Sequence, residues 1–83
     1  MADTERVWLV YREYTDKGML DLTYATEDGE RVLHRQRSLN AGDPTAAVEA
    51  EPDELEPADA EEQEPYRDEV TRMREQHAPE DVV

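Results

Sequence analysis

Three arginines carry the clearest recognition chemistry in this chain of 83 residues. Arg31, Arg35 and Arg37 lie at alternate positions of one predicted strand, so their side chains should leave the same face of a sheet. Arginine beside exposed aromatic and aliphatic groups is typical of the energetic centre of a protein interface. The pattern predicts a partner-binding face made of Leu9, Tyr11, Met19, Leu33, Arg31, Arg35 and Arg37.

Two other interpretations of the arginines stay open. Glu13, Asp21 and neighbouring acids could neutralise them within the sheet, which would make them structural. Arginines on an apolar face could also contact nucleic acid, but a net charge of -14 opposes binding to a polyanion unless salt screens it. We therefore expect a protein partner or a homodimer, with nucleic-acid binding as the alternative.

Residues that could perform catalysis or bind metal are sparse. His34 and His77 are far apart in the sequence, and neither has a second strong ligand at helix or strand spacing. Ser38 is the only serine, cysteine is absent, and the three glycines are isolated. No nucleophile elbow or phosphate-binding loop can be built from them. The sequence predicts a protein that is not an enzyme and has no cofactor or metal site.

The charge is strongly acidic and unevenly placed. Asp and Glu total 23 against 9 Lys and Arg, and Lys17 is the only lysine. This composition is typical of a surface that stays hydrated in concentrated salt, where screening reduces self-repulsion. No apolar run approaches the ~20 residues of a membrane span, and the N-terminus has no secretory apolar segment. We expect a halophilic, cytoplasmic protein that binds no membrane.

The elements that must position the arginines lie in residues 1–40. Segments 7–14, 19–26 and 30–39 are rich in Val, Leu, Tyr, Trp and Thr, which favour strands. The loops Thr15-Asp16-Lys17-Gly18 and Thr26-Glu27-Asp28-Gly29 share one form. Each fits a type I turn followed by a left-handed glycine. Two similar hairpins in a row predict an antiparallel meander.

These turns also predict the register and the faces of the sheet. The predicted pairs are Tyr14–Leu20, Arg12–Leu22, Val10–Tyr24 and Trp8–Thr26, then Tyr24–Val32, Leu22–His34 and Leu20–Gln36, with Asp21 opposite Arg35. The core face would then hold Trp8, Val10, Tyr14, Leu20, Leu22, Tyr24 and Val32, with His34 among them. The second face would leave Val7, Leu9, Tyr11, Met19 and Leu33 facing water.

The second half of the chain predicts one helix. It should span residues 65–78, begin at Pro65 and present Tyr66, Val70, Met73 and His77 on one face, with an Asp68–Arg72 pair on its surface. Residues 41–64 read as an acidic, proline-rich connection. Within it, residues 45–50 could form a short helix or an edge strand, and we favour the strand. The predicted fold is one α+β domain over residues 1–83: a three-stranded, possibly four-stranded, antiparallel meander with one C-terminal helix packed on one face.

Several segments together resemble a known group of proteins. They are Val7-Trp8-Leu9-Val10, Tyr24-Ala25-Thr26-x-Asp28-Gly29-Glu30-Arg31, Thr45-Ala46-Ala47-Val48, Tyr66-x-x-Glu69-x-x-Arg72-Met73 and His77-x-Pro79-x-Asp81. Over most of its length the chain resembles small uncharacterised acidic proteins of haloarchaea. The resemblance implies a salt-rich setting and no assigned activity.

Overall fold

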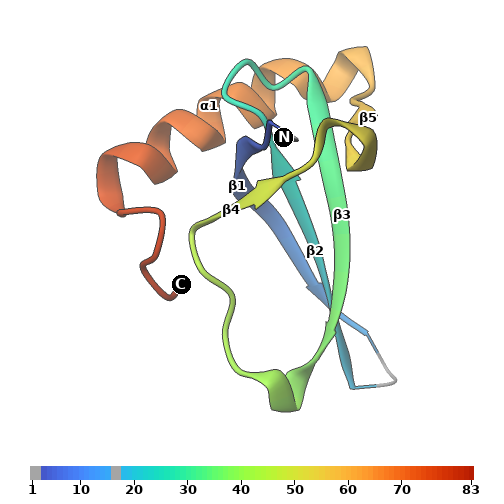
Figure 1. The fold of residues 1–83 in the computed structure, drawn as a ribbon, viewed down its shortest axis with the longest axis vertical. Coiled ribbons are helices and arrows are strands. Elements are labelled where there is room, and N and C mark those ends of the chain that lie inside the picture. The colour runs from blue at the N-terminus through green and yellow to red at the C-terminus, as the bar shows by residue number, and fades with distance from the viewer. Residues whose placement is uncertain (1–2, 16–17) are drawn as a thin grey trace.

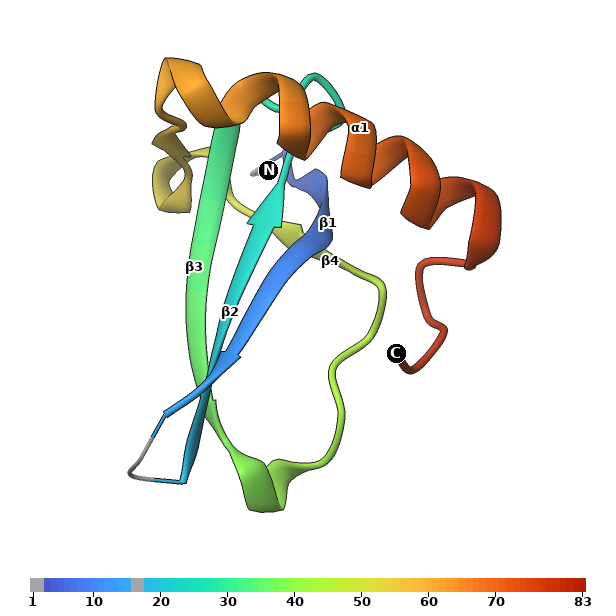
Figure 2. The same cartoon turned by 180° about the vertical axis from the view of Figure 1, so that it is seen from behind.

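The computed structural model describes residues 3–15 and 18–83. Five strands form one antiparallel sheet in the order β4-β1-β2-β3-β5, and one helix lies on it (Figures 1 and 2). The elements are β1 Glu5–Tyr14, β2 Met19–Ala25, β3 Arg31–Ser38, η1 Leu39–Ala41, β4 Ala47–Ala50, η2 Pro52–Glu54, β5 Glu56–Pro57 and α1 Ala60–Gln76. The fold is therefore α+β with an antiparallel sheet, as predicted, but it has more strands than the meander.

The two edge strands lie close to each other along the chain. β4 pairs with β1, with Val7 opposite Val48, and β5 pairs with β3 at Arg31 and Val32. Only residues 51–55 join them, and η2 takes up part of that length, so the sheet curls and one face becomes concave (Figure 1). β4 confirms the predicted edge strand. β5 was missed because a strand of two residues, one of them proline, carries no periodic pattern.

The first hairpin follows the predicted register only near its turn. Tyr14 lies opposite Leu20 and Arg12 opposite Leu22, but β1 then has an irregularity between Leu9 and Tyr11. The pairs beyond it are Leu9–Tyr24 and Trp8–Ala25, so the predicted Val10–Tyr24 and Trp8–Thr26 pairs are wrong. A bulge inserts one extra residue into a strand, which turns the side chains beyond it to the opposite face.

The second hairpin closes one residue later than the first. The Thr15 N–H donates to the Met19 carbonyl at 2.9 Å, whereas the Thr26 N–H donates to the Arg31 carbonyl at 3.0 Å. Every predicted pair of the second hairpin is therefore wrong by one residue. The observed pairs are Tyr24–Leu33, Leu22–Arg35, Leu20–Arg37 and Asp21–Gln36.

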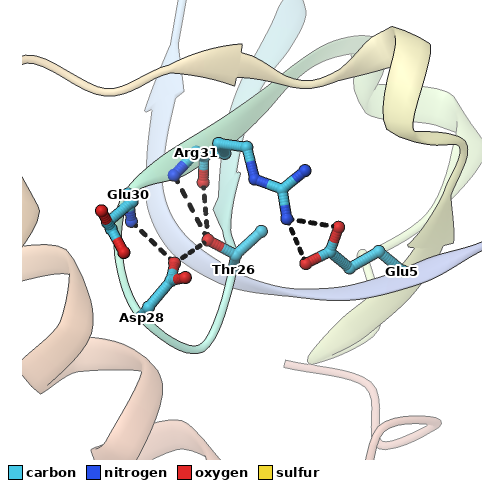
Figure 3. Close-up of polar contacts among 5 residues, drawn as sticks. All are labelled: Glu5, Thr26, Asp28, Glu30 and Arg31. Carbon is cyan, nitrogen blue, oxygen red and sulfur yellow. Dashed lines mark hydrogen bonds and ion pairs between the residues drawn. The ribbon is translucent and has the colours of Figure 1, made fainter.

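Side-chain hydrogen bonds stabilise the longer loop (Figure 3). Asp28 Oδ1 accepts the Thr26 hydroxyl at 2.5 Å and the Glu30 N–H at 2.9 Å. The Arg31 N–H donates to Thr26 Oγ1 at 3.2 Å. The equivalent position in the first loop is lysine, which has no acceptor atom. This polar network, which is specific to the second loop, therefore stabilises the register of β3.

Helix α1 begins at Ala60 and contains Pro65, so the predicted start at Pro65 is wrong. Glu61 and Glu62, expected to precede the helix, form its first turn, where the helix dipole favours carboxylates. The predicted apolar stripe is confirmed for Val70 and Met73, which are buried, and for Tyr66, which is partly buried. The helix ends at Gln76, so His77, predicted on the same face, follows it as an extended cap residue. Arg72 forms its ion pair with Glu69, not with Asp68 as predicted.

The core draws on both faces of the sheet, which corrects the predicted open face. Val7, Leu9 and Leu33, expected to face water, are only 0%, 5% and 3% exposed. Trp8 is buried as predicted, whereas Tyr14 is 63% exposed and His34 is exposed. Figures 1 and 2 show α1 on one face and the link from β4 to β5 on the other, so each face has a cover.

Candidate partner-binding site

The arginines of β3 lie on the concave face of the sheet. Leu33 lies opposite Tyr24, Arg35 opposite Leu22, and Arg37 opposite Leu20, and paired residues share a face. Alternation along the strand places Arg31 on this face as well. The face therefore combines guanidinium groups of β3 with apolar side chains of β2.

The seven residues of the predicted partner-binding face do not form one surface. Leu9 and Leu33 share the concave face with the arginines but are buried in the core. Tyr11 lies opposite Thr23, and Met19 opposite Ser38, which places both on the other face of the sheet. Tyr11 is 53% exposed there, and Met19 is partly exposed. Of the predicted set, only Arg35 and Arg37 lie next to each other on one face and line a hollow.

Two of the arginines already have acidic partners. Arg31 Nη2 donates to both carboxylate oxygens of Glu5, at 2.5 Å to Oε2 (Figure 3). Arg35 Nη2 donates to Glu54 Oε2 at 2.8 Å. The neutralising acids are therefore in β1 and η2, not the predicted Glu13 and Asp21. The Arg35–Glu54 pair is about half exposed on both sides, a setting in which ion pairs contribute about 0–1 kcal/mol.

Arg37 differs from its neighbours in the strand. Its Nη2 donates to the Ala41 carbonyl at 3.0 Å, and no carboxylate in residues 3–15 or 18–83 forms an ion pair with it. Its Nε is buried and has no hydrogen-bond partner in the same residues. A buried charged donor without an acceptor is costly. Because Nε is enclosed by protein atoms, an anion in the space beside Arg37 would reach it through the Nη groups of its guanidinium.

A hollow of about 320 Å³ adjoins these two arginines. Its apolar lining comes from Leu22, Tyr24, Ala41 and Val48, and its polar lining includes Arg35, Gln36, Arg37 and Glu49. Glu49 is engaged by Arg6, with 3.2 Å between Oε2 and Nε. Burial raises the pKa of Tyr24, and the nearby Arg37, Arg35 and Arg12 partly oppose that rise. The hollow is thus a depression of mixed apolar and polar lining, in which two arginines lie close to Tyr24.

The outer edge of β3 next to the hollow is free along most of its length. β5 pairs only with Arg31 and Val32. The Arg31 carbonyl accepts from Thr26 of the inner hairpin, whereas the Glu30 carbonyl accepts from Ala58 on the outer side. Because backbone groups alternate along a strand, His34 and Gln36 direct their N–H and C=O groups outward. In the described part of the chain no strand pairs with them, and both residues are exposed.

The metal-binding side chains of the described residues do not form a cluster. No group of three or more histidines or acids in 3–15 and 18–83 could hold a metal ion. His34 Nδ1 lies 3.4 Å from Thr23 Oγ1 on the sheet, and His77 Nδ1 lies 3.8 Å from Asp81 Oδ2 after α1. The described helix is too short and polar to cross a membrane.

Sequence reasoning missed Ala41, Val48 and the free edge as parts of this site. Ala41 and Val48 come from the connection and from the edge strand, and they reach the hollow only because the sheet curls. The free edge follows from the shortness of β5. The predicted edge strand at residues 45–50 was the available signal, but it did not indicate which side of the sheet it would border.

Comparison with known proteins places the chain in a family. No curated protein and no solved structure matches it. A family model covers residues 1–83, which is the whole sequence. The chain therefore belongs to DUF7967, a family of unknown function.

Proposed function

We propose that this protein is a non-catalytic interaction module that binds an acidic segment of another protein at the arginine-lined hollow. The observation that carries the proposal is Arg37, a cation with no acidic partner in the described residues, placed beside an apolar hollow. Arginine next to an apolar pocket is the composition that concentrates binding energy at interfaces. A carboxylate in the hollow would give the Arg37 guanidinium an ionic partner and a charge-assisted hydrogen bond.

Charge complementarity favours another protein over a second copy of this chain. Two hollows facing each other across a two-fold axis would bring arginines together, and like charges at an interface are unfavourable. The overall charge of -14 repels any anionic partner, but it opposes nucleic acid more than a short acidic segment, because a long polyanion would extend beyond the hollow. Self-association and nucleic-acid binding are therefore alternative outcomes of the test.

The test is a selection of random peptides displayed on phage against the folded protein. We expect enrichment of peptides that contain acidic and apolar residues, and loss of their binding in Arg37→Gln. Arg67→Gln on the exposed surface of α1 is the matched control and should retain binding. Failure to enrich any peptide that depends on Arg37 would remove the proposed function. Sedimentation equilibrium and titration with oligothymidylate check the two alternatives directly.

A further inference from the structure

We propose that the partner adds an extended strand to the free edge of β3 and places carboxylates at alternate positions opposite Arg35 and Arg37. The inference rests on the proposed function and specifies the backbone conformation and side-chain pattern of the acidic segment. It joins two observations that are independent of each other: an unpaired strand edge and a charged hollow beside it.

The backbone of β3 offers a template for strand addition. His34 and Gln36 direct N–H and C=O groups away from β2, beyond the point where β5 ends. An exposed edge of this kind pairs readily with an extended peptide, which gains main-chain hydrogen bonds independent of its sequence. β5 shows the principle within the chain, because it already pairs with the first part of the same edge.

The side chains of β3 add a requirement on sequence. Residues directly opposite each other on neighbouring strands have β carbons about 4.5–5.5 Å apart. A strand added to β3 would therefore present every second side chain on the concave face, opposite Arg35 and Arg37. Glutamate or aspartate at these positions would pair with Arg37 and compete with Glu54 for Arg35. That exchange is accessible because the Arg35–Glu54 pair is half exposed.

The same geometry disfavours a second copy of β3 as the added strand. Antiparallel pairing centred on Gln36 would place Arg35 of each copy opposite Arg37 of the other. Like charges directly opposite are destabilising, and charged edge residues are a known protection against unwanted pairing. The arginines would thus reject an identical strand and accept an acidic one.

The test uses a short fluorescein-labelled peptide with glutamate at every second position and threonine between, measured by fluorescence anisotropy. The first control peptide has the same composition but its glutamates in one block. The second keeps the sequence and carries N-methyl groups on alternate backbone nitrogens, which blocks strand pairing. The protein variants are Arg37→Gln, Arg35→Gln and the helix-surface control Arg67→Gln, each checked for folding by thermal melting.

We expect saturable binding of the alternating peptide and weakening by about tenfold in Arg37→Gln, the size of one charge-assisted hydrogen bond. Arg35→Gln should weaken binding less, because Glu54 already occupies that arginine. The block peptide and the N-methylated peptide should both bind at least about tenfold more weakly. Arg67→Gln should bind like the wild type. This pattern would support strand addition through a change in the peptide backbone, so that β3 itself need not be altered.

Two results would overturn the inference. Equal binding of the N-methylated peptide would exclude strand addition, and equal binding of the block peptide would exclude reading of alternate positions. If no peptide binds while the random selection still yields binders that depend on Arg37, the inference falls and the proposed function stands. If neither assay shows dependence on Arg37, both the inference and the proposed function fall, and the arginines serve only to prevent unwanted pairing at the edge of β3.

Discussion

The two hairpins of this protein have loops of nearly the same sequence and different geometry. Both loops begin with threonine and end with a glycine at a φ of +73°. The first closes at Thr15 and Met19, and the second closes one residue later, at Thr26 and Arg31. The difference lies in the surroundings, since helix α1 packs against Gly29, whereas none of the described residues reaches within 4 Å of a β carbon placed at Gly18. The local sequence favours a tight turn that ends in a left-handed glycine, and contact with the rest of the fold decides at which residue the turn closes.

The largest difference between the hairpins is expected in the stability losses caused by Gly29→Ala and Gly18→Ala. Both changes place a β carbon at positive φ, which costs roughly 1–2 kcal/mol. At Gly29 the new β carbon would also lie 2.8 Å from the Arg67 backbone nitrogen, so α1 must move. Chemical denaturation should show a loss of about 3 kcal/mol or more for Gly29→Ala. Equal losses in the two variants would mean that α1 does not press on the second loop.

The second largest difference is expected between the stability losses caused by replacing Thr26 and Thr15. Thr26 is 2% exposed and its hydroxyl joins Asp28 to the Arg31 N–H. Among the described residues, the Thr15 hydroxyl has one side-chain hydrogen bond, to the Met19 carbonyl at 3.2 Å. Thr26→Val leaves polar groups without partners, which should lower the free energy of unfolding by about 1–3 kcal/mol. Thr15→Val should cost about 1 kcal/mol or less. Urea melts of the matched pair test this, and a larger cost at Thr15 would contradict it.

Asp28 should make the second hairpin sensitive to acid. The Thr26 hydroxyl, followed by the Glu30 N–H, lowers the pKa of Asp28 below its usual value. A lowered pKa contributes stability above the unfolded-state pKa of about 3.9, and this contribution is lost as the pH falls through the folded value. NMR titration should show the lowered pKa, and Asp28→Asn should flatten the stability profile below about pH 4. An unchanged profile would show that the network does not depend on the charge.

The smallest effect is expected from Lys17→Asp, which gives the first loop the same Thr-acid-Asp-Gly form as the second. We expect the first hairpin to keep its register, with Tyr14 opposite Leu20, because in residues 3–15 and 18–83 no helix packs beside Gly18. The free energy of unfolding should change by about 0.5 kcal/mol or less. Amide chemical shifts and nuclear Overhauser contacts across β1 and β2 provide the measurement. A shift of pairing by one residue would show that the loop sequence alone decides the register.

The comparison also explains what could be predicted from the sequence. The two left-handed glycines, the edge strand at 45–50 and the stripe with Val70 and Met73 follow from local patterns, and the structure bears them out. The irregularity in β1 and the longer second loop depend on packing and side-chain networks that no local pattern reveals. Each shifts pairing by one residue, and a single such shift exchanges the two faces of a strand.

The prediction of the candidate site was affected most by these shifts in pairing. Alternation along β3 correctly kept Arg35 and Arg37 on one face, but the predicted apolar neighbours came from pairings that the structure replaces. Leu9 and Leu33 are therefore buried in the core, and Tyr11 and Met19 lie on the opposite face. The acid-rich surface still predicts tolerance of concentrated salt, an expectation that rests on composition alone.

The short link between β4 and β5 also constrains the order in which the chain can fold. The meander of β1, β2 and β3 needs only contacts between neighbours in the sequence, which close quickly. β4 must return to β1 from about 40 residues away, as in the pairing of Val7 with Val48. β5 follows within a few residues and reaches the opposite edge. We therefore expect the meander to form first, and the curl of the sheet, with the hollow, to follow when β4 and β5 pair.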